Sequence, residues 1–347
     1  MKRKVSRKKN KSRRKRIYTK KGGNTNIILE TINNSNILYS TTLVHFVEVY
    51  YRYCIDLFKS ALDKNYNFNV VFRFSQAQED EMNNSKKFGD YLNKLNTNNK
   101  TIRVDINHEH TLVKGDQQVY PHNAPNGKIS YINNSTKKYK VSLYKYDELK
   151  KSDIILDYSN TNIENLKGSN IYSSYSNKLI YIAPAFFDLY VSKDSRNIDC
   201  LTTFINQEVE RRKKLIENVK AQNINLTNVN NVFSKNDLRQ LYKNTKILIN
   251  IHQTEGNHTF EELRVLPALL CGCIVVAEDS PLKELIPYSN CIIWSSYDTI
   301  VNKVKEVSDN YDKYFNDIFA NQDNLNILKG LHNQNILSLQ NKLNSLK

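Results

Sequence analysis

The sequence has 347 residues, of which 39% are apolar and 25% are charged. Because one hydrophobic core rarely serves more than about 250–300 residues, we expect two domains. No apolar run reaches the roughly 18 residues of a membrane span, and the amino terminus is a block of charge instead of an apolar signal core. These features argue against secretion and predict an intracellular protein without a transmembrane segment.

The five cysteines predict neither a disulfide framework nor a zinc site. Cys54, Cys200, Cys271, Cys273 and Cys291 are odd in number, and no two of them form a C-x-x-C pair. We therefore expect reduced thiols, most of them buried.

The formal net charge of +16 is concentrated at the amino terminus. Residues 1–21 contain thirteen of the 51 Lys and Arg residues and no acidic residue, which leaves 38 basic against 35 acidic residues in the rest. Residues 1–23 cannot bury apolar surface, so we expect a disordered basic tail. Residues 2–21 are suited to bind nucleic acid or an anionic surface, to act as a nuclear address, or to serve only as a solubilising extension.

After the tail, the apolar pattern alternates between the periods of strands and of helices. In the first half it predicts a helix over 41–59, strands over 69–74, 101–106 and 153–158, and a polar loop over 115–130. We interpret residues 24–190 as an amino-terminal α/β domain. An exposed link over 192–197 then leads into the second domain.

The second half of the chain, from a strand predicted over 179–187 onward, alternates strands and helices more regularly. Within the second domain, 191–310, the predicted strands are 198–205, 226–233, 246–252, 273–277 and 291–294. The predicted helices are 208–222, 236–244, 260–271, 281–286 and 298–307, and helical spacing continues over 311–347. Such alternation predicts a parallel sheet covered by helices, with a binding crevice at the carboxyl ends of its strands.

The segment 246–279, KILINIHQTEGNHTFEELRVLPALLCGCIVVAED, carries most of the chemistry. A strand ends at His252, a loop with one glycine follows, and a helix opens with two acidic residues. The unpaired N–H groups at a helix start attract anions, so the loop 253–259 is suited to cradle a phosphate. The candidate residues of this loop and helix start are His252, Glu255, Gly256, Asn257, His258, Thr259 and Glu262.

Each candidate type has its own chemistry. Gly256 permits close approach of the backbone, His258 and Thr259 donate to phosphate oxygens, and Glu255 or Glu262 accepts from ribose or sugar hydroxyls. Alternatively, the acidic pair at 261–262 only complements the helix start while Thr259 caps it.

The order N-x-H, loop, E-x-x-R-x-x-P-A-L-x-C-G and V-V-A-E-D resembles the donor-binding domain of group 1 glycosyltransferases of GT-B fold, including those of large DNA viruses. The resemblance is specific over 246–295 and looser back to 198. It implies two Rossmann-like lobes with a cleft between them, of which the first, 24–190, binds the acceptor and the second, 191–310, binds the nucleotide sugar. It also implies a terminal helix over 311–347 that packs back on the first lobe. Pro267 stands where the family usually has a ribose-binding Glu; Glu261 or Glu262 substitutes for it, or the donor is held differently.

The resemblance also implies the activity. Such enzymes move a sugar, commonly a hexose, from a nucleotide-diphosphate donor to a glycan, protein or lipid acceptor, without a metal or other cofactor. Glu262 and Arg264 fall where some relatives have an acidic residue and an arginine. If the chain is viral, the implied location is the host cytoplasm or the virion.

A second basic group lies near the start of the helix predicted over 208–222. Arg211 and Arg212 oppose the helix dipole there, which indicates an external anion. In GT-B enzymes a basic pair at this point meets the diphosphate, so one of these arginines is a candidate for that role. A solvated basic face is the alternative.

The first half contributes one polar cluster, directly after the strand over 101–106. Glu109 lies between His108 and His110, and a carboxylate or imidazole is suited to take the proton of an acceptor hydroxyl. A metal site and a plain structural loop are the alternatives, and no third metal ligand is evident.

Two further function classes stay open. The chain could be a nucleic-acid-binding or virion-associated protein that uses the basic tail on a catalytically silent GT-B scaffold. It could also be another sugar-nucleotide enzyme of GT-B shape, such as an epimerase.

Overall fold

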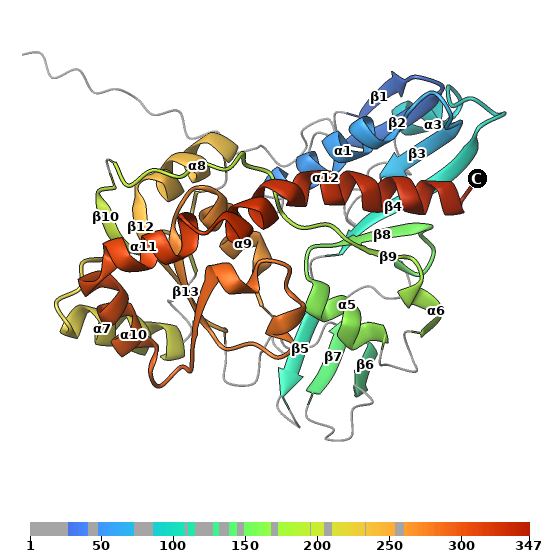
Figure 1. Ribbon diagram of the computed structural model, residues 1–347. Coiled ribbons are helices and arrows are strands. Elements are labelled where there is room, and N and C mark those ends of the chain that lie inside the picture. Colours follow the sequence, from blue (N-terminus) through green and yellow to red (C-terminus); the bar gives the residue numbers. More distant parts are fainter. Residues whose placement is uncertain are drawn as a thin grey trace, which may run out of the picture.

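The computed structural model describes residues 27–40, 48–72, 86–107, 110–114, 128–131, 139–143, 149–167, 173–194, 196–204, 210–232, 234–253 and 260–347. These residues form two lobes, each built around a largely parallel sheet, and a pair of C-terminal helices that reaches both lobes (Figure 1).

The first lobe contains a six-stranded sheet with the strand order β1-β2-β3-β4-β8-β9. Its strands are β1 (Ile27–Ile32), β2 (Ser35–Ser40), β3 (Phe68–Phe72), β4 (Lys100–Asn107), β8 (Ile154–Asp157) and β9 (Leu179–Tyr181). β1 and β2 pair antiparallel, whereas the other neighbours are parallel. Every residue of β3 and β8 is buried, as expected for strands covered on both faces.

The second lobe contains a five-stranded, wholly parallel sheet with the order β11-β10-β12-β13-β14. Its strands are β10 (Ile198–Thr202), β11 (Leu226–Asn228), β12 (Thr245–Asn250), β13 (Ile274–Glu278) and β14 (Ile292–Ser295). The helices are α7 (Glu210–Ala221), α8 (Lys235–Lys243), α9 (Glu262–Leu270) and α10 (Ile300–Asp309), with short 3-10 turns η1 (Lys283–Leu285) and η2 (Ser289–Cys291).

This strand order creates a topological switch point. β11 and β12 lie on opposite sides of β10, so the chain leaves β10 in one direction through α7 and returns past it through α8. In open α/β sheets, ligands bind outside the carboxyl ends of the strands at such a point. We therefore expect a ligand site at the carboxyl ends of β10 and β12.

A smaller antiparallel sheet belongs to the first half of the chain. It consists of β5 (His110–Lys114), β6 (Lys128–Tyr131) and β7 (Tyr139–Leu143) in the order β5-β7-β6. The remaining helices of this half are α1 (Glu48–Ala61), α3 (Lys86–Leu92), α5 (Asn160–Lys167) and α6 (Ser173–Ser176). The polar loop predicted over 115–130 is wrong for 128–130, because pairing with β7 makes this polar stretch a strand.

The link between the two large sheets is exposed, as predicted, at Lys193, Asp194 and Asn197, but not at Arg196. Its described residues within 182–197 contain neither helix nor strand. Arg196 is only 6% exposed, which contradicts the prediction of an exposed link at that residue. Its guanidinium donates to the carbonyl oxygens of Ser192 at 2.8 Å, Tyr242 at 3.2 Å, Thr245 at 2.5 Å and Cys271 at 2.8 Å. Arg196 therefore fastens the link to the second lobe.

The C-terminal segment crosses back to the first lobe. Its helices are α11 (Tyr311–Phe319) and α12 (Gln322–Ser345), and α12 runs from beside the second lobe to α1 (Figure 1). Asn335 of α12 accepts from the N–H of Ala183 at 3.0 Å and donates to the hydroxyl of Tyr53 at 2.9 Å. No helix in the described part of the chain, α12 included, is long and apolar enough to cross a membrane.

The arrangement confirms the predicted fold class. Two parallel-sheet lobes joined by a crossing link and a returning C-terminal helix form the GT-B architecture. All five cysteines are free and buried, as predicted, and burial raises the pKa of every thiol. These thiols are therefore packing residues rather than nucleophiles.

Candidate functional site

The carboxyl edge of the second sheet carries charged side chains where β12 and β13 end. Glu278 is the last residue of β13, and His252 lies two residues beyond β12. Because these strands are parallel neighbours, the residues meet, and the N–H of His252 donates to Oε2 of Glu278 at 2.9 Å. Nε2 of His252 lies 2.9 Å from the carbonyl oxygen of Asp279, so this contact requires the hydrogen on Nε2.

Arg211 reaches this group from the first turn of α7. Its Nη1 donates to Oε2 of Glu278 at 2.7 Å, and its Nη2 donates to the other carboxylate oxygen. The side chains of this pair are 11% and 9% exposed. The guanidinium also lies 3.6 Å from the ring centroid of Tyr297, whose hydroxyl donates to the carbonyl oxygen of Arg211 at 2.7 Å. Stacking and a bidentate ion pair therefore fix this arginine.

The ion pair determines the charge of the site. Burial raises the pKa of Glu278, but the bidentate bond from Arg211 and the positive fields of His252 and Arg211 outweigh it and hold that pKa below its ordinary value. The carboxylate is therefore ionised at neutral pH and compensates Arg211. A phosphate that approached Arg211 would compete with Glu278 for the same N–H groups.

The other two predicted arginines lie in different surroundings. Arg212 is 9% exposed, and its guanidinium carbon lies 4.7 Å from the ring centroid of Phe204, just after β10. Arg264, half-buried in α9, donates from Nη1 to Oδ1 of Asn250 at 3.2 Å. Arg264 and Arg211 thus approach the end of β12 from two helices.

Described residues lie on both sides of the phosphate loop predicted over 253–259. Phe260 is fully buried, and its ring centroid lies 5.0 Å from that of Trp294. Glu261 is the N-cap residue of α9, and its side chain makes no capping hydrogen bond. The predicted residues Glu255, Gly256, Asn257, His258 and Thr259 lie outside the described residues.

Glu262, also predicted, lies at the contact between the two lobes. Its carboxyl group is fully buried. Oε2 accepts from the hydroxyl of Tyr181 at 2.7 Å and from the hydroxyl of Tyr288 at 2.6 Å, and Oε1 accepts from the N–H of Asn160 at 3.2 Å. Tyr181 and Asn160 belong to the first lobe and Tyr288 to the second, so one carboxyl group connects both.

The pKa of Glu262 moves opposite to that of Glu278. Burial raises it to about 8, although the hydrogen bonds from Tyr288, Tyr181 and Asn160 act in the lowering direction. The buried carboxylate of Asp157 adds to the rise. At neutral pH the Glu262 carboxyl group is therefore mostly protonated.

The predicted acid–base cluster lies mainly outside the described residues. His108 and Glu109 belong to the undescribed part of the chain. The main chain of His110 opens β5, opposite Leu143 of β7, and its side chain is not among those described. In the described stretches, no three His, Cys, Asp or Glu side chains are grouped closely enough to hold a metal ion.

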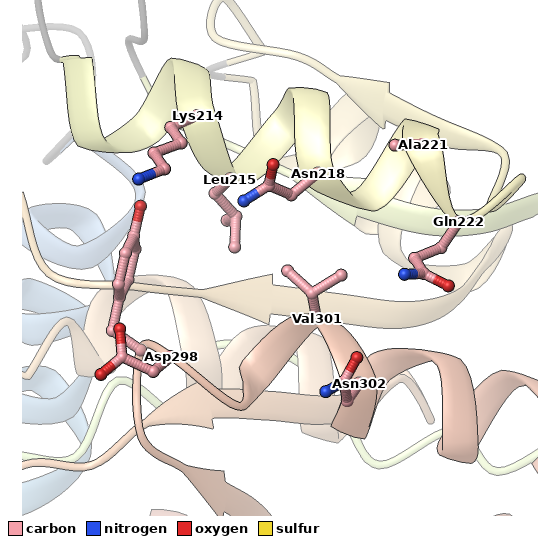
Figure 2. Close-up of a pocket in the computed structure, with 9 residues that line it drawn as sticks. Lys214, Leu215, Asn218, Ala221, Gln222, Asp298, Val301 and Asn302 are labelled. Carbon is pink, nitrogen blue, oxygen red and sulfur yellow. The ribbon is translucent and has the colours of Figure 1, made fainter.

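A cavity of about 340 Å³ lies between α7 and α10 of the second lobe. Figure 2 shows Leu215 and Val301 pointing toward each other between the two helices, with Lys214 and Asp298 at one end and Gln222 at the other. Most of its lining side chains are exposed. It is an open groove that adjoins the charged group at the carboxyl edge, because Tyr297, which stacks on Arg211, also lines it.

Sequence reasoning missed four residues of this region. Glu278 ends the strand V-V-A-E, and a carboxylate at a strand end in an α/β sheet is a signal that could have identified it. Tyr181, Tyr288 and Tyr297 carry no such signal, because nothing separates them from the other tyrosines of a chain that has 22.

No family model matches the chain. Among known sequences, the chain is 26% identical over 265 residues to an uncharacterized protein of Acanthamoeba polyphaga mimivirus. That alignment covers 75% of this chain and 87% of the mimivirus protein.

Among solved structures, the chain is similar to the crystal structure of TarM, with a TM-score of 0.46 and 9% identity over 80% of this chain and 54% of that one. It is also similar to an S. aureus TarM mutant in complex with Fondaparinux, alpha-GlcNAc-glycerol and UDP, with a TM-score of 0.41 and 9% identity over 80% of this chain and 53% of that one. The chain thus spans about half the length of these solved chains. Its GT-B fold is assigned from the strand orders of the two large sheets and not from these similarities.

Proposed function

We propose that the chain is a glycosyltransferase of GT-B type that moves a sugar from a nucleotide-diphosphate sugar to an acceptor. The observation that carries the proposal is the meeting of α7, α9 and the end of β12 at the switch point of the second sheet, opposite the first lobe. In open α/β sheets this is where a nucleotide binds.

The second lobe would hold the diphosphate by electrostatics. The amino end of α9 carries a partial positive charge that attracts an anion, while the N–H groups of Glu262 and Arg264 donate to the carbonyl oxygens of Phe260 and Glu261. Arg264 lies in the first turn of that helix beside Asn250, and Arg211 lies across the end of β12, paired with Glu278. Arg264, and Arg211 where the diphosphate displaces Glu278, favour the charge that develops on the departing diphosphate, so the proposed mechanism needs no metal ion or other cofactor.

The proposed reaction is a substitution at the anomeric carbon of the donor sugar. An acceptor hydroxyl forms a new C–O bond there, and the bond to the diphosphate breaks with its electron pair on the leaving oxygen. A base takes the proton of the acceptor hydroxyl, and we propose Glu109, flanked by His108 and His110, for this role. The proposed acceptors are glycans, proteins or lipids.

Calorimetry with UDP, GDP, ADP and CMP tests the site. We expect at least one nucleotide to bind the parent protein, and Arg264→Ala to weaken that binding by roughly tenfold, the factor lost with one charge-assisted hydrogen bond. Arg52→Ala is a matched control, because Arg52 is an exposed arginine of α1 that pairs only with Glu48 in the hydrogen bonds and ion pairs described. Equal affinities of the two variants would contradict the assignment of Arg264.

A second candidate function is binding of nucleic acid or another polyanion by residues 2–21. The thirteen basic residues without an acidic one in residues 1–21 favour it. Deletion of residues 1–23 separates the candidates, because salt-sensitive nucleic-acid affinity should disappear while nucleotide binding stays. The similarity to a mimivirus protein supports a viral origin, for which we propose the host cytoplasm or the virion as the location.

A further inference from the structure

The two lobes meet at Glu262. Beyond the bonds of Tyr181 and Asn160 to its carboxyl group, Nδ2 of Asn160 donates to the carbonyl oxygen of Leu285 at 2.7 Å. Tyr181 ends β9 and Asn160 begins α5 in the first lobe, whereas Leu285 closes η1 in the second. Three hydrogen bonds therefore join the carboxyl edge of the first sheet to the second lobe.

The contact involves the amino end of α9 itself. Glu262 is the first residue of that helix, so a group that holds its side chain also holds the helix start relative to the first lobe. A carboxyl group buried this completely needs its donors, because a buried polar group without partners is costly. If the lobes separated, Tyr181 and Asn160 would leave together and water would have to replace both.

We propose that Glu262 is a positioning residue that latches the two lobes together, with Tyr181 as its partner from the first lobe. The latch sets the separation at which the helix start of α9 faces the first lobe. Its consequence for sugar transfer rests on the proposed function, because the donor and the acceptor would be bound on opposite sides of this contact. The latch itself needs no substrate.

Two tyrosines provide a matched pair of variants. Tyr181 and Tyr288 donate to the same oxygen at almost the same distance, but the bond from Tyr181 to Glu262 crosses between the lobes, whereas Tyr288 contacts the first lobe through a hydrogen bond with the side chain of Tyr181. Tyr181→Phe and Tyr288→Phe each remove one hydroxyl and keep the ring. They therefore share any effect of losing a bond to Glu262 and differ in the effect on the lobes.

The separation of the lobes is measured by pulsed electron paramagnetic resonance on the full chain. Spin labels attached through Asp56→Cys on α1 and Glu217→Cys on α7 occupy exposed helical positions in opposite lobes, and the native cysteines are buried. We expect Tyr181→Phe to raise the ratio of long to short distances by about fivefold, the factor that one buried hydrogen bond is worth. We expect Tyr288→Phe, which keeps the bond from Tyr181 to Glu262, to raise the ratio less than Tyr181→Phe does.

Unchanged distances in Tyr181→Phe would overturn the latch, and so would an equal shift in both variants. This result is independent of the proposed function, which fails separately if no nucleoside diphosphate binds the parent protein. If UDP or another nucleotide does bind, kcat with its sugar donor should fall about fivefold in Tyr181→Phe while nucleotide affinity stays within twofold. An unchanged kcat despite shifted distances would overturn the positioning role.

Discussion

Two buried carboxyl groups in the second lobe show how partners decide ionisation. Glu278 has a guanidinium on both oxygens, so its pKa is lowered despite burial. Glu262 has only hydroxyl and amide donors, so burial dominates and its pKa rises. At neutral pH, Glu278 is therefore ionised and paired with Arg211, whereas Glu262 is mostly protonated and neutral.

The ion pair predicts a large effect of neutralising Glu278. In Glu278→Gln the buried guanidinium of Arg211 loses its counter-charge, and removal of one partner from a buried pair costs about 3–5 kcal/mol. Urea unfolding at pH 7 measures this loss. Glu48→Gln, which breaks an exposed pair with Arg52, is the control and should change little. Equal stability of the two variants would contradict the structural role of Glu278.

Glu262 predicts a pH dependence of stability with a definite sign. Its pKa is raised on folding from the ordinary value of 4.5 to about 8, so its contribution is fully present below 4.5 and is lost as pH rises toward 8. Glu262→Gln keeps the shape without this ionisation. The melting temperature of the parent should therefore fall relative to the variant between pH 5 and pH 8 and then level off. A difference that stays constant over this range would mean that Glu262 does not titrate in this way.

Local patterns in the sequence led to candidate residues but not to their contacts. A strand end and a basic pair led to His252 and Arg211, and the family resemblance led to Arg264. The pairing of Arg211 with Glu278 spans 67 positions and that of Tyr181 with Glu262 spans 81, and no local pattern encodes such contacts.

Among the structural elements, the turn after α9 depends on one glycine. Gly272 has a φ of +75°, and a Cβ there would lie 2.4 Å from Nη2 of Arg196 and 2.8 Å from the carbonyl oxygen of Tyr190. The guanidinium that fastens the link therefore occupies the space a side chain would need. Glycine is required here both for its backbone and for its missing Cβ.

Gly272→Ala should therefore lower the free energy of unfolding by at least about 1–2 kcal/mol, the cost of a left-handed conformation alone. Gly330→Ala in α12 is the matched control, because the nearest atom to its Cβ would be Nε2 of Gln334 at 3.7 Å. Alanine favours a helix interior, so this variant should be neutral or more stable. The melting temperatures of the two variants, measured by thermal unfolding, test this difference. Equal melting temperatures would refute the role of Gly272.

The predicted elements match the structure best where periodicity is strong. Each strand and helix predicted between 198 and 277 has a counterpart, because buried β-branched runs and amphipathic helices alternate there. The hairpin of β1 and β2 and the strands β5 to β7 were not predicted. These short segments become strands through pairing with neighbours, which a single sequence does not display.

In the whole molecule, the two lobes are connected at more places than the linker between them. The link fastened by Arg196, the return of α12 and the contact at Glu262 join them at separate places. The first two are chain crossings and stay intact when the lobes move, whereas the third consists only of hydrogen bonds. Relative motion should therefore break the contact at Glu262 first.

The central claim is that the meeting of α7, α9 and β12 binds a nucleotide diphosphate sugar. A thermal-shift screen of the full chain against nucleotide sugars tests it most directly, because a ligand that binds only the native state stabilises it by about 2.7 kcal/mol at a hundred times its Kd. We expect at least one nucleotide sugar to raise the melting temperature by a few degrees, and Arg264→Ala to lessen this rise. Melting temperatures unmoved by every nucleotide sugar at millimolar concentration would contradict it.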